Sequence, residues 1–145
     1  MTGPTSPTPH RRTRADHASE IAEDYCEAIA EIDVEGRGCR VTDLAGRFGV
    51  SHVTVVRTIK RLERDGLVRT EPRRPIHLTA HGRRLATRCR ERHELVYRFL
   101  VALGVDPRIA SVDAEGIEHH VSPSTLARFK AFVEDDDGPR TPARP

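Results

Sequence analysis

Residues 41–66, V-T-D-L-A-G-R-F-G-V-S-H-V-T-V-V-R-T-I-K-R-L-E-R-D-G, constrain the fold more than any other segment. Their apolar positions recur at intervals of three and four on either side of a Gly-Val-Ser turn, which predicts two short helices. Thr42 and Ser51 are suited to cap the helix N-termini, and Gly49 and Gly66 to end the helices. Two short helices joined in this way predict a helix-turn-helix.

The second of these helices has two different faces. We expect its buried face to consist of Val55, Val56, Ile59 and Leu62. In a helix-turn-helix this helix enters the major groove of DNA, and its early residues contact base edges. The residues predicted on this basis to contact DNA are Ser51, His52, Thr54, Arg57, Thr58, Lys60 and Arg61.

Two short runs that resemble strands follow, at 67–70 and 76–78. The Pro-containing bend between them predicts a β-wing with Arg73 and Arg74 at its tip, placed for the DNA backbone or minor groove. From residue 40 to residue 90, thirteen Arg and Lys stand against four Asp and Glu, although the whole chain has a net charge of only +2. A basic segment of this kind favours contact with a polyanion.

Acidic residues collect on both sides of the basic segment. Glu115, Glu118 and His119 follow one another at i, i+3 and i+4, and Asp24 and Glu27 at i, i+3, which places each set on one side of a helix. A solvated acidic face is the alternative interpretation. Carboxylates and imidazoles without thiolates suit Mn²⁺ or Fe²⁺. The residues that offer such donors are Asp24, Glu27, Glu115, Glu118 and His119, together with His93, which alone is more often a surface or core residue than a ligand.

An enzyme is the competing class, because a carboxylate-rich site for two metal ions can hydrolyse esters or activate oxygen. The segment H-E-L-V-Y at 93–97 resembles the zincin motif H-E-x-x-H, but its last residue is Tyr97. Neither Glu115 nor Glu118 has a histidine three residues later, unlike the E-x-x-H pairs of di-iron proteins. No catalytic nucleophile is evident, so a di-metal hydrolase or oxygenase is disfavoured.

These motifs together resemble the manganese-responsive branch of the diphtheria-toxin-repressor (DtxR) family of metal-dependent repressors. The resemblance extends over about residues 17–134. The segments that carry it are E-D-Y-C-E-A-I at 23–29, the helix-turn-helix at 41–66, R-H-E-L-V at 92–96, F-L-V-A-L-G-V at 99–105 and D-A-E-G-I-E-H-H-V-S at 113–122.

The resemblance implies a mainly α chain with a winged helix-turn-helix DNA-binding domain, a helical dimerisation and metal-binding domain, and no C-terminal SH3-like domain. The expected division is a disordered tail at 1–14, the DNA-binding domain at 15–79, the helical domain at 80–135 and a second disordered tail at 136–145. Within the helical parts we expect helices at about 17–35, from Thr79 to Leu103, from Pro107 to Gly116, and from Ser122 past Val133.

By the same resemblance the six candidate ligands hold two Mn²⁺ ions per subunit, and a homodimer binds operator DNA of manganese uptake or efflux genes. Iron-responsive relatives have methionine at the position of Asp24 and a sulfur residue at that of Glu118. An iron- or zinc-responsive regulator of the same fold stays as the alternative. The seam of the dimer, or else the monomer core, would come from Phe99, Leu103, Leu126, Phe129 and Val133.

Two features depart from the family pattern. The wing reads Pro-Arg-Arg-Pro where relatives usually have a glycine-containing turn. Cys26 lies between two expected ligands, where it is either a core residue or a thiol that tunes metal preference or sensitivity to oxidants.

The remaining expectations concern location and partners. The three cysteines have no C-x-x-C spacing and are expected to be reduced thiols in the cytoplasm. No apolar run approaches the ~18 residues of a membrane span. We expect neither a membrane nor a small organic ligand as a partner.

Overall fold

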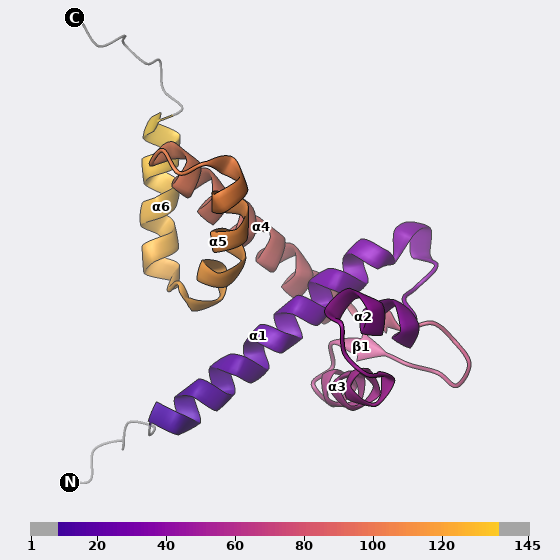
Figure 1. Cartoon of the computed structure of the whole chain (residues 1–145). Coiled ribbons are helices and arrows are strands. Elements are labelled where there is room, and N and C mark those ends of the chain that lie inside the picture. The colour runs from indigo at the N-terminus through magenta and orange to yellow at the C-terminus, as the bar shows by residue number, and fades with distance from the viewer. Residues whose placement is uncertain (1–8, 137–145) are drawn as a thin grey trace, which may run out of the picture. The chain divides into compact units, whose positions relative to one another are not determined.

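The computed structural model describes residues 9–136, and side chains from residue 15 onward. The chain forms two compact units, one up to Thr87 and one from Arg88 (Figure 1). In chain order the elements are α1 (Pro9–Ile32), η1 (Val34–Gly36), α2 (Val41–Phe48), α3 (His52–Arg64), β1 (Val68–Arg69), β2 (His77–Leu78), α4 (Ala80–Ala102), α5 (Pro107–Ile117), η2 (Glu118–His120) and α6 (Pro123–Asp136), where η marks a 3₁₀ turn.

The predicted helix pair is present as α2 and α3. Gly49 ends α2 with a φ of 62°, a conformation that glycine adopts without steric cost. The hydroxyl of Ser51 accepts a hydrogen bond from the Thr54 N–H at 3.2 Å, which confirms Ser51 as the cap of α3. The prediction that Thr42 caps α2 was wrong, because α2 begins one residue before it and the backbone N–H of Arg40 donates to Asp43 instead.

The first unit closes around an apolar core. Its largest fully buried side chains are Cys26, Ile29, Cys39, Leu44, Val55, Leu62 and Val68. Three of the four residues expected on the buried face of α3 are buried. Val56 is the exception, with 40% of its surface exposed, because it lies beyond the stripe of α3 that faces α2.

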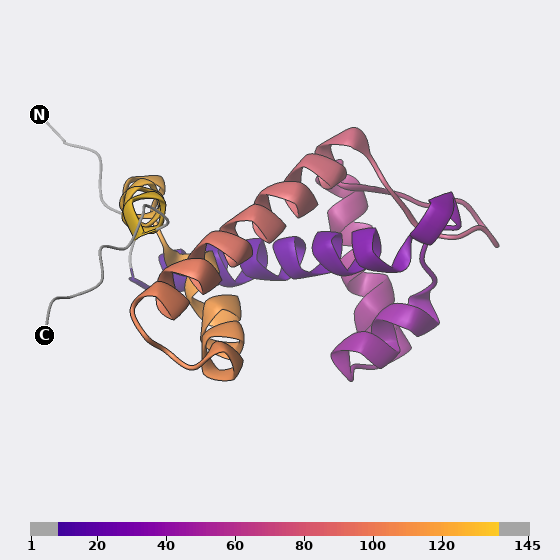
Figure 2. The ribbon, with the colours of Figure 1, turned by 90° about the horizontal axis from the view of Figure 1, so that it is seen from above.

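The wing is a two-stranded antiparallel ribbon in which Val68 lies opposite Leu78. Cys39 extends it by one isolated bridge to Ile76, with backbone hydrogen bonds of 2.9 and 2.7 Å. The loop between β1 and β2 projects away from α2 and α3 (Figure 2). The ribbon therefore carries the tip of the wing out of the core.

The first helix differs from its prediction at both ends. α1 starts at Pro9 and ends at Ile32, so the expected disordered tail at 1–14 overlaps its first turns, while residues 1–8 lie outside the described part. Proline is compatible with a first helical turn. At the other end Asp33 leaves the helix, and its carboxylate accepts from the Gly38 N–H at 2.5 Å. The second expected tail lies outside the described residues except for Asp136, which ends α6.

In the second unit, the ring of Phe99 in α4 stacks on that of Phe129 in α6, with centroids 3.8 Å apart. Val96 and Val133 of the same unit are buried. Of the residues expected in either the monomer core or the dimer seam, Val133 is buried in this unit, while Phe99 and Phe129 are half-buried. Leu103 is 56% exposed and stays available for a seam.

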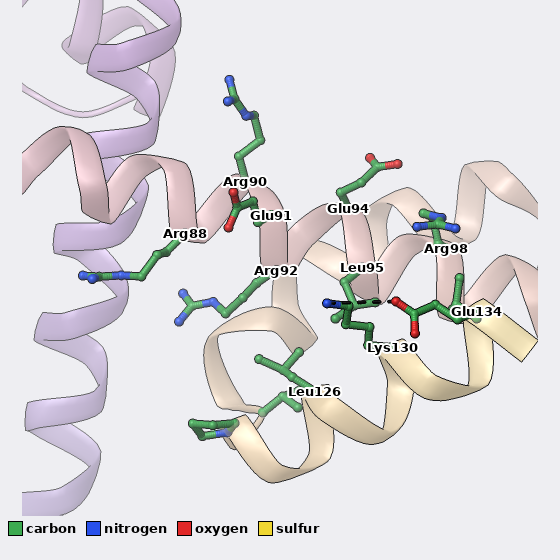
Figure 3. Close-up of a pocket in the computed structure, with 13 residues that line it drawn as sticks. Arg88, Arg90, Glu91, Arg92, Glu94, Leu95, Arg98, Leu126, Lys130 and Glu134 are labelled. Carbon is green, nitrogen blue, oxygen red and sulfur yellow. Dashed lines mark ion pairs between the residues drawn. The ribbon is translucent and has the colours of Figure 1, made fainter.

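A groove of about 920 Å³ runs between α4 and α6 within this unit (Figure 3). Leu95 and Leu126 line its floor, and Arg88 and Arg92 lie towards one end. None of the described helices is both long enough and apolar enough to cross a bilayer.

Candidate metal centre and nucleic-acid interface

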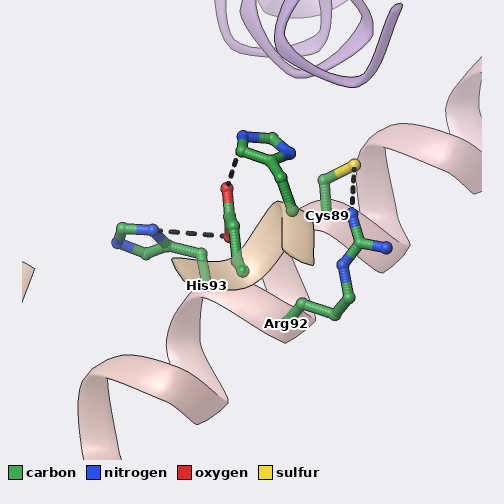
Figure 4. A network of polar contacts seen from close by, with 5 residues as sticks. Cys89, Arg92 and His93 are labelled. Atoms are coloured by element: carbon green, nitrogen blue, oxygen red, sulfur yellow. Dashed lines mark hydrogen bonds and ion pairs between the residues drawn. The ribbon is translucent and has the colours of Figure 1, made fainter. Parts of the chain in front are cut away.

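Glu118 is the one buried charged side chain among the described residues, with 3% of its surface exposed. Its two carboxylate oxygens lie near two imidazoles of the same unit, one of which is that of His93 (Figure 4). Oε2 lies 3.6 Å from Nδ1 of His93, and Oε1 lies 3.5 Å from Nε2 of His119. The structure thus brings together three of the six predicted ligands.

Local structure explains how these three residues meet. Asp106 caps the N-terminus of α5, because its carboxylate accepts from the Arg108 N–H at 2.9 Å. The helix ends at Ile117 and tightens into the 3₁₀ turn of η2, which carries Glu118 and His119. His93 comes from the middle of α4. The helix end thereby places Glu118 against His93, which comes from a distant part of the sequence, and His119 against the other carboxylate oxygen of Glu118.

The other predicted ligands lie on helices as expected. Glu115 is exposed on α5, one turn before Glu118. Asp24 and Glu27 are half-buried on α1 in the first unit, where Tyr25 and Cys26 beside them are buried. The acidic pair therefore borders the core of that unit.

The structure assigns Cys26 to the core. Its side chain is fully buried, and burial raises the pKa of the thiol to about 12, with a smaller contribution from the carboxylate of Glu23. Its surroundings are the apolar core of the first unit.

The sequence motifs did not single out the neighbours of His93 on α4. The guanidinium of Arg92 lies 3.6 Å from Sγ of the buried Cys89, one turn earlier (Figure 4). Arg92 also lines the groove between α4 and α6. A signal was present, since Arg92 is part of the R-H-E-L-V segment, but the segment does not show where the guanidinium points.

The polar face of α3 is open to solvent. Most of the residues predicted to contact DNA are exposed: Ser51, His52, Thr54, Arg57 and Lys60. Thr58 and Arg61 are half-buried, and the Thr58 hydroxyl donates to the Thr54 carbonyl at 3.0 Å within the helix. The wing arginines, Arg73 and Arg74, are exposed.

Two apolar residues share this face and were missed. Val53 is 67% exposed and Val56 40% exposed. Together with His52, Arg57 and Lys60 they line a shallow hollow of about 360 Å³. The exposed face is thus basic with an apolar patch, a combination that can meet phosphates, base edges and thymine methyl groups.

Comparisons with known proteins match both units. The N-terminal DNA binding domain of the iron dependent repressor family matches residues 17–76. The metal binding and dimerisation domain of the same family matches residues 79–138. The chain belongs to the iron dependent repressor (DtxR) family.

Relatives place this DtxR-family chain near manganese regulators. It is 46% identical over 124 residues to the "Transcriptional regulator MntR" of Escherichia coli O157:H7, covering 86% of this chain and 80% of the relative. It is 36% identical over 118 residues to the "HTH-type transcriptional regulator MntR" of Bacillus subtilis, covering 79% and 83%.

A solved "Manganese-dependent transcriptional repressor complex with manganese" aligns with a TM-score of 0.68 and 34% identity. The alignment covers 78% of this chain and 52% of that one, so the chain spans about half the length of the solved protein. As a DtxR-family member the chain is a DNA-binding transcriptional regulator and not an enzyme. Its relatives favour manganese over the iron and zinc alternatives.

Proposed function

We propose that this regulator binds operator DNA in response to Mn²⁺, held by Asp24, Glu27, His93, Glu115, Glu118 and His119 as two ions per subunit. The observation that carries the proposal is the buried carboxylate of Glu118 between two imidazoles. A buried carboxylate is costly unless it is paired with positive charge. A bound divalent cation would supply that charge.

The donor set fits the proposed ion. Oxygen and imidazole ligands suit Mn²⁺, while softer metals prefer sulfur. The thiol of Cys26 is packed in the apolar core of the first unit, and the six proposed ligands offer only oxygen and nitrogen. Relatives whose names state manganese support the same choice.

The ligands belong to both units, and this suggests how metal would control DNA binding. Asp24 and Glu27 precede the helix-turn-helix on α1, while the other four lie on α4, α5 and η2. Neutralising acids from both units would restrict the arrangements that the units adopt. We expect metal to favour the DNA-competent arrangement, with a coupling free energy of about 1–3 kcal/mol, and DNA to raise metal affinity by the same factor.

On the DNA side, we propose that α3 enters the major groove through Ser51, His52, Thr54, Arg57, Thr58, Lys60 and Arg61, while Arg73 and Arg74 reach DNA from the wing. The exposure of most of this face supports the assignment. A homodimer would hold its two α3 helices about one DNA turn apart, roughly 34 Å. The family's dimerisation domain supports the homodimer.

The exposed apolar residues of the second unit are candidates for the dimer seam: Val101, Leu103, Ile109, Val112, Ile117 and Phe132. Sedimentation of metal-free protein tests the homodimer, and a monomer at micromolar concentration would contradict a metal-independent seam. Repression of uptake genes, activation of efflux genes, a cytoplasmic location and the absence of a small organic ligand stay predictions.

The decisive experiment measures operator affinity at buffered free Mn²⁺, Fe²⁺ and Zn²⁺. We expect Mn²⁺ to tighten binding by about five- to 150-fold, the range of ordinary allosteric coupling. Equal affinity with and without Mn²⁺ would refute the proposed response. Equilibrium dialysis of the same protein should count two Mn²⁺ ions per subunit.

Three variants separate the two sites. Glu27→Ala should abolish the Mn²⁺ response and leave the fold intact by circular dichroism. Glu94→Gln removes an exposed carboxylate of α4 and should behave as wild type. Arg57→Ala should weaken operator binding without changing the Mn²⁺ affinity of the free protein. Full manganese-dependent binding by Glu27→Ala would show that the ligand assignment is wrong.

A further inference from the structure

The tip of the wing contains an arginine in a conformation that suits glycine. Residues 71–74 form a tight turn in which the Arg74 N–H donates to the Glu71 carbonyl at 3.1 Å. Pro72 is the second residue of this turn, and Arg73 is the third, with a φ of 62°. Turns with positive φ at the third position strongly favour glycine or asparagine there, because a β-carbon crowds the following carbonyl.

No contact within the chain accounts for this choice of residue. Among the described residues, the side chain of Arg73 makes no hydrogen bond and no ion pair. Nε of Arg74, by contrast, lies 4.0 Å from the carboxylate of Glu71. Strained residues persist where function requires the side chain. A partner outside the chain would account for an arginine at this position.

The turn also holds the backbone at Arg73 rigid before any partner binds. Pro72 and Pro75 flank the two arginines and restrict the backbone on both sides. A stiff loop loses less conformational entropy on binding than a flexible one. The ribbon below it leads away from α2 and α3, so the tip extends past the helix pair (Figure 2).

We propose that Arg73 is kept at this strained position because its guanidinium inserts into a narrow, A·T-rich minor groove beside the major groove occupied by α3. This inference rests on the operator binding proposed above. A narrow minor groove has an enhanced negative potential that attracts arginine. The guanidinium is also weakly hydrated, which lowers the cost of entering the groove. Arg73 would thus read the shape of the DNA flanking the bases that α3 contacts.

Arg73→Gly tests the proposal, because stability and DNA affinity should change in opposite directions. Relief of the positive-φ strain should raise Tm by about 2–5 °C. The duplex for this test is the one that the wild-type protein selects from a randomised pool in the presence of Mn²⁺. Arg73→Gly should bind it about five- to twentyfold more weakly. The salt dependence of its affinity should correspond to about one fewer counterion released on binding. Arg74→Gly is the matched control for stability, since Arg74 does not have a positive φ and its replacement should not raise Tm.

Comparing the selected duplex with one that has altered flanks distinguishes a contact in the minor groove from a contact with the phosphates. Changing the flanking A·T pairs to G·C should lower the DNA affinity of the wild-type protein and leave that of Arg73→Gly unchanged. If Arg73→Gly binds as tightly as wild type, or if both proteins respond equally to the G·C flanks, the minor-groove contact is excluded. Failure of the wild-type protein to select any duplex would overturn the proposed operator binding itself, which is a different result.

Discussion

Gly82 lies where the wing meets α4, and replacing it with alanine should destabilise the first unit. A β-carbon at this position would lie 2.1 Å from the carbonyl oxygen of Leu67 and 3.0 Å from Cδ2 of Leu78. Carbon and oxygen ordinarily approach to about 3.3 Å, so the two segments must separate by more than 1 Å. The Leu67 carbonyl also accepts from the Thr79 N–H at 3.0 Å, and that bond would be strained.

These effects set the expected magnitude. Overpacking against backbone costs about 3 kcal/mol, at the upper end of its usual range. Weakening the Thr79 hydrogen bond adds about 1 kcal/mol, and the better helix propensity of alanine returns about 1 kcal/mol. We therefore expect Gly82→Ala to lower the free energy of unfolding by about 3 kcal/mol and Tm by roughly 10 °C.

The assay is urea and thermal unfolding followed by circular dichroism, in a chelator so that metal binding does not contribute. Gly46→Ala is the matched control, because Gly46 lies within α2 and a β-carbon there would meet no atom within 4 Å. The control should gain about 0.5–1 kcal/mol of stability. If Gly82→Ala is as stable as the wild type, the close approach of α4 to the Leu67 carbonyl is not as described.

Three further predictions concern the cores and a cap. Burial raises the pKa of both Cys26 and Cys39 to about 12, so these thiols stay protonated at pH 9. Iodoacetamide should therefore leave them unmodified in native protein and modify them in urea. Equal rates of modification in the two states, measured by mass spectrometry, would contradict their burial. Phe99→Ala removes a ring stacked on Phe129 and should cost about 3 kcal/mol in urea unfolding, a loss that a surface position would not show. Ser51→Ala removes the cap of α3 and should cost about 1 kcal/mol; an unchanged unfolding midpoint would show that the cap contributes nothing.

Local chemistry explains why much of the first unit was predictable. Ser51 and Gly49 mark helix ends through contacts within a few residues, and such contacts depend little on the rest of the fold. The start of α1 was misjudged because its first turns have no apolar period, and a helix can extend without one. The predicted cap of α2 failed because the carboxylate of Asp43 accepts from the Arg40 N–H, so the helix begins one residue before Thr42.

Burial was harder to predict than helix position. Val56 was expected in the core from its apolar character, yet 40% of its surface is exposed. Spacing shows which side of its own helix a residue occupies, but the width of the buried stripe depends on the neighbouring helices. The left-handed conformation of Arg73 was equally hidden, because the residue type argues against it.

By itself the sequence determined which chemistry the chain carries: carboxylates and imidazoles at helical spacing, a basic helix-turn-helix, and the turns that separate them. Tertiary structure alone decided that Glu118 is buried and that its carboxylate lies within 3.6 Å of both His93 and His119. The physical reason is that helical periodicity acts over a few residues. Which distant helix faces a given side chain depends on how the apolar surfaces of the whole unit pack together.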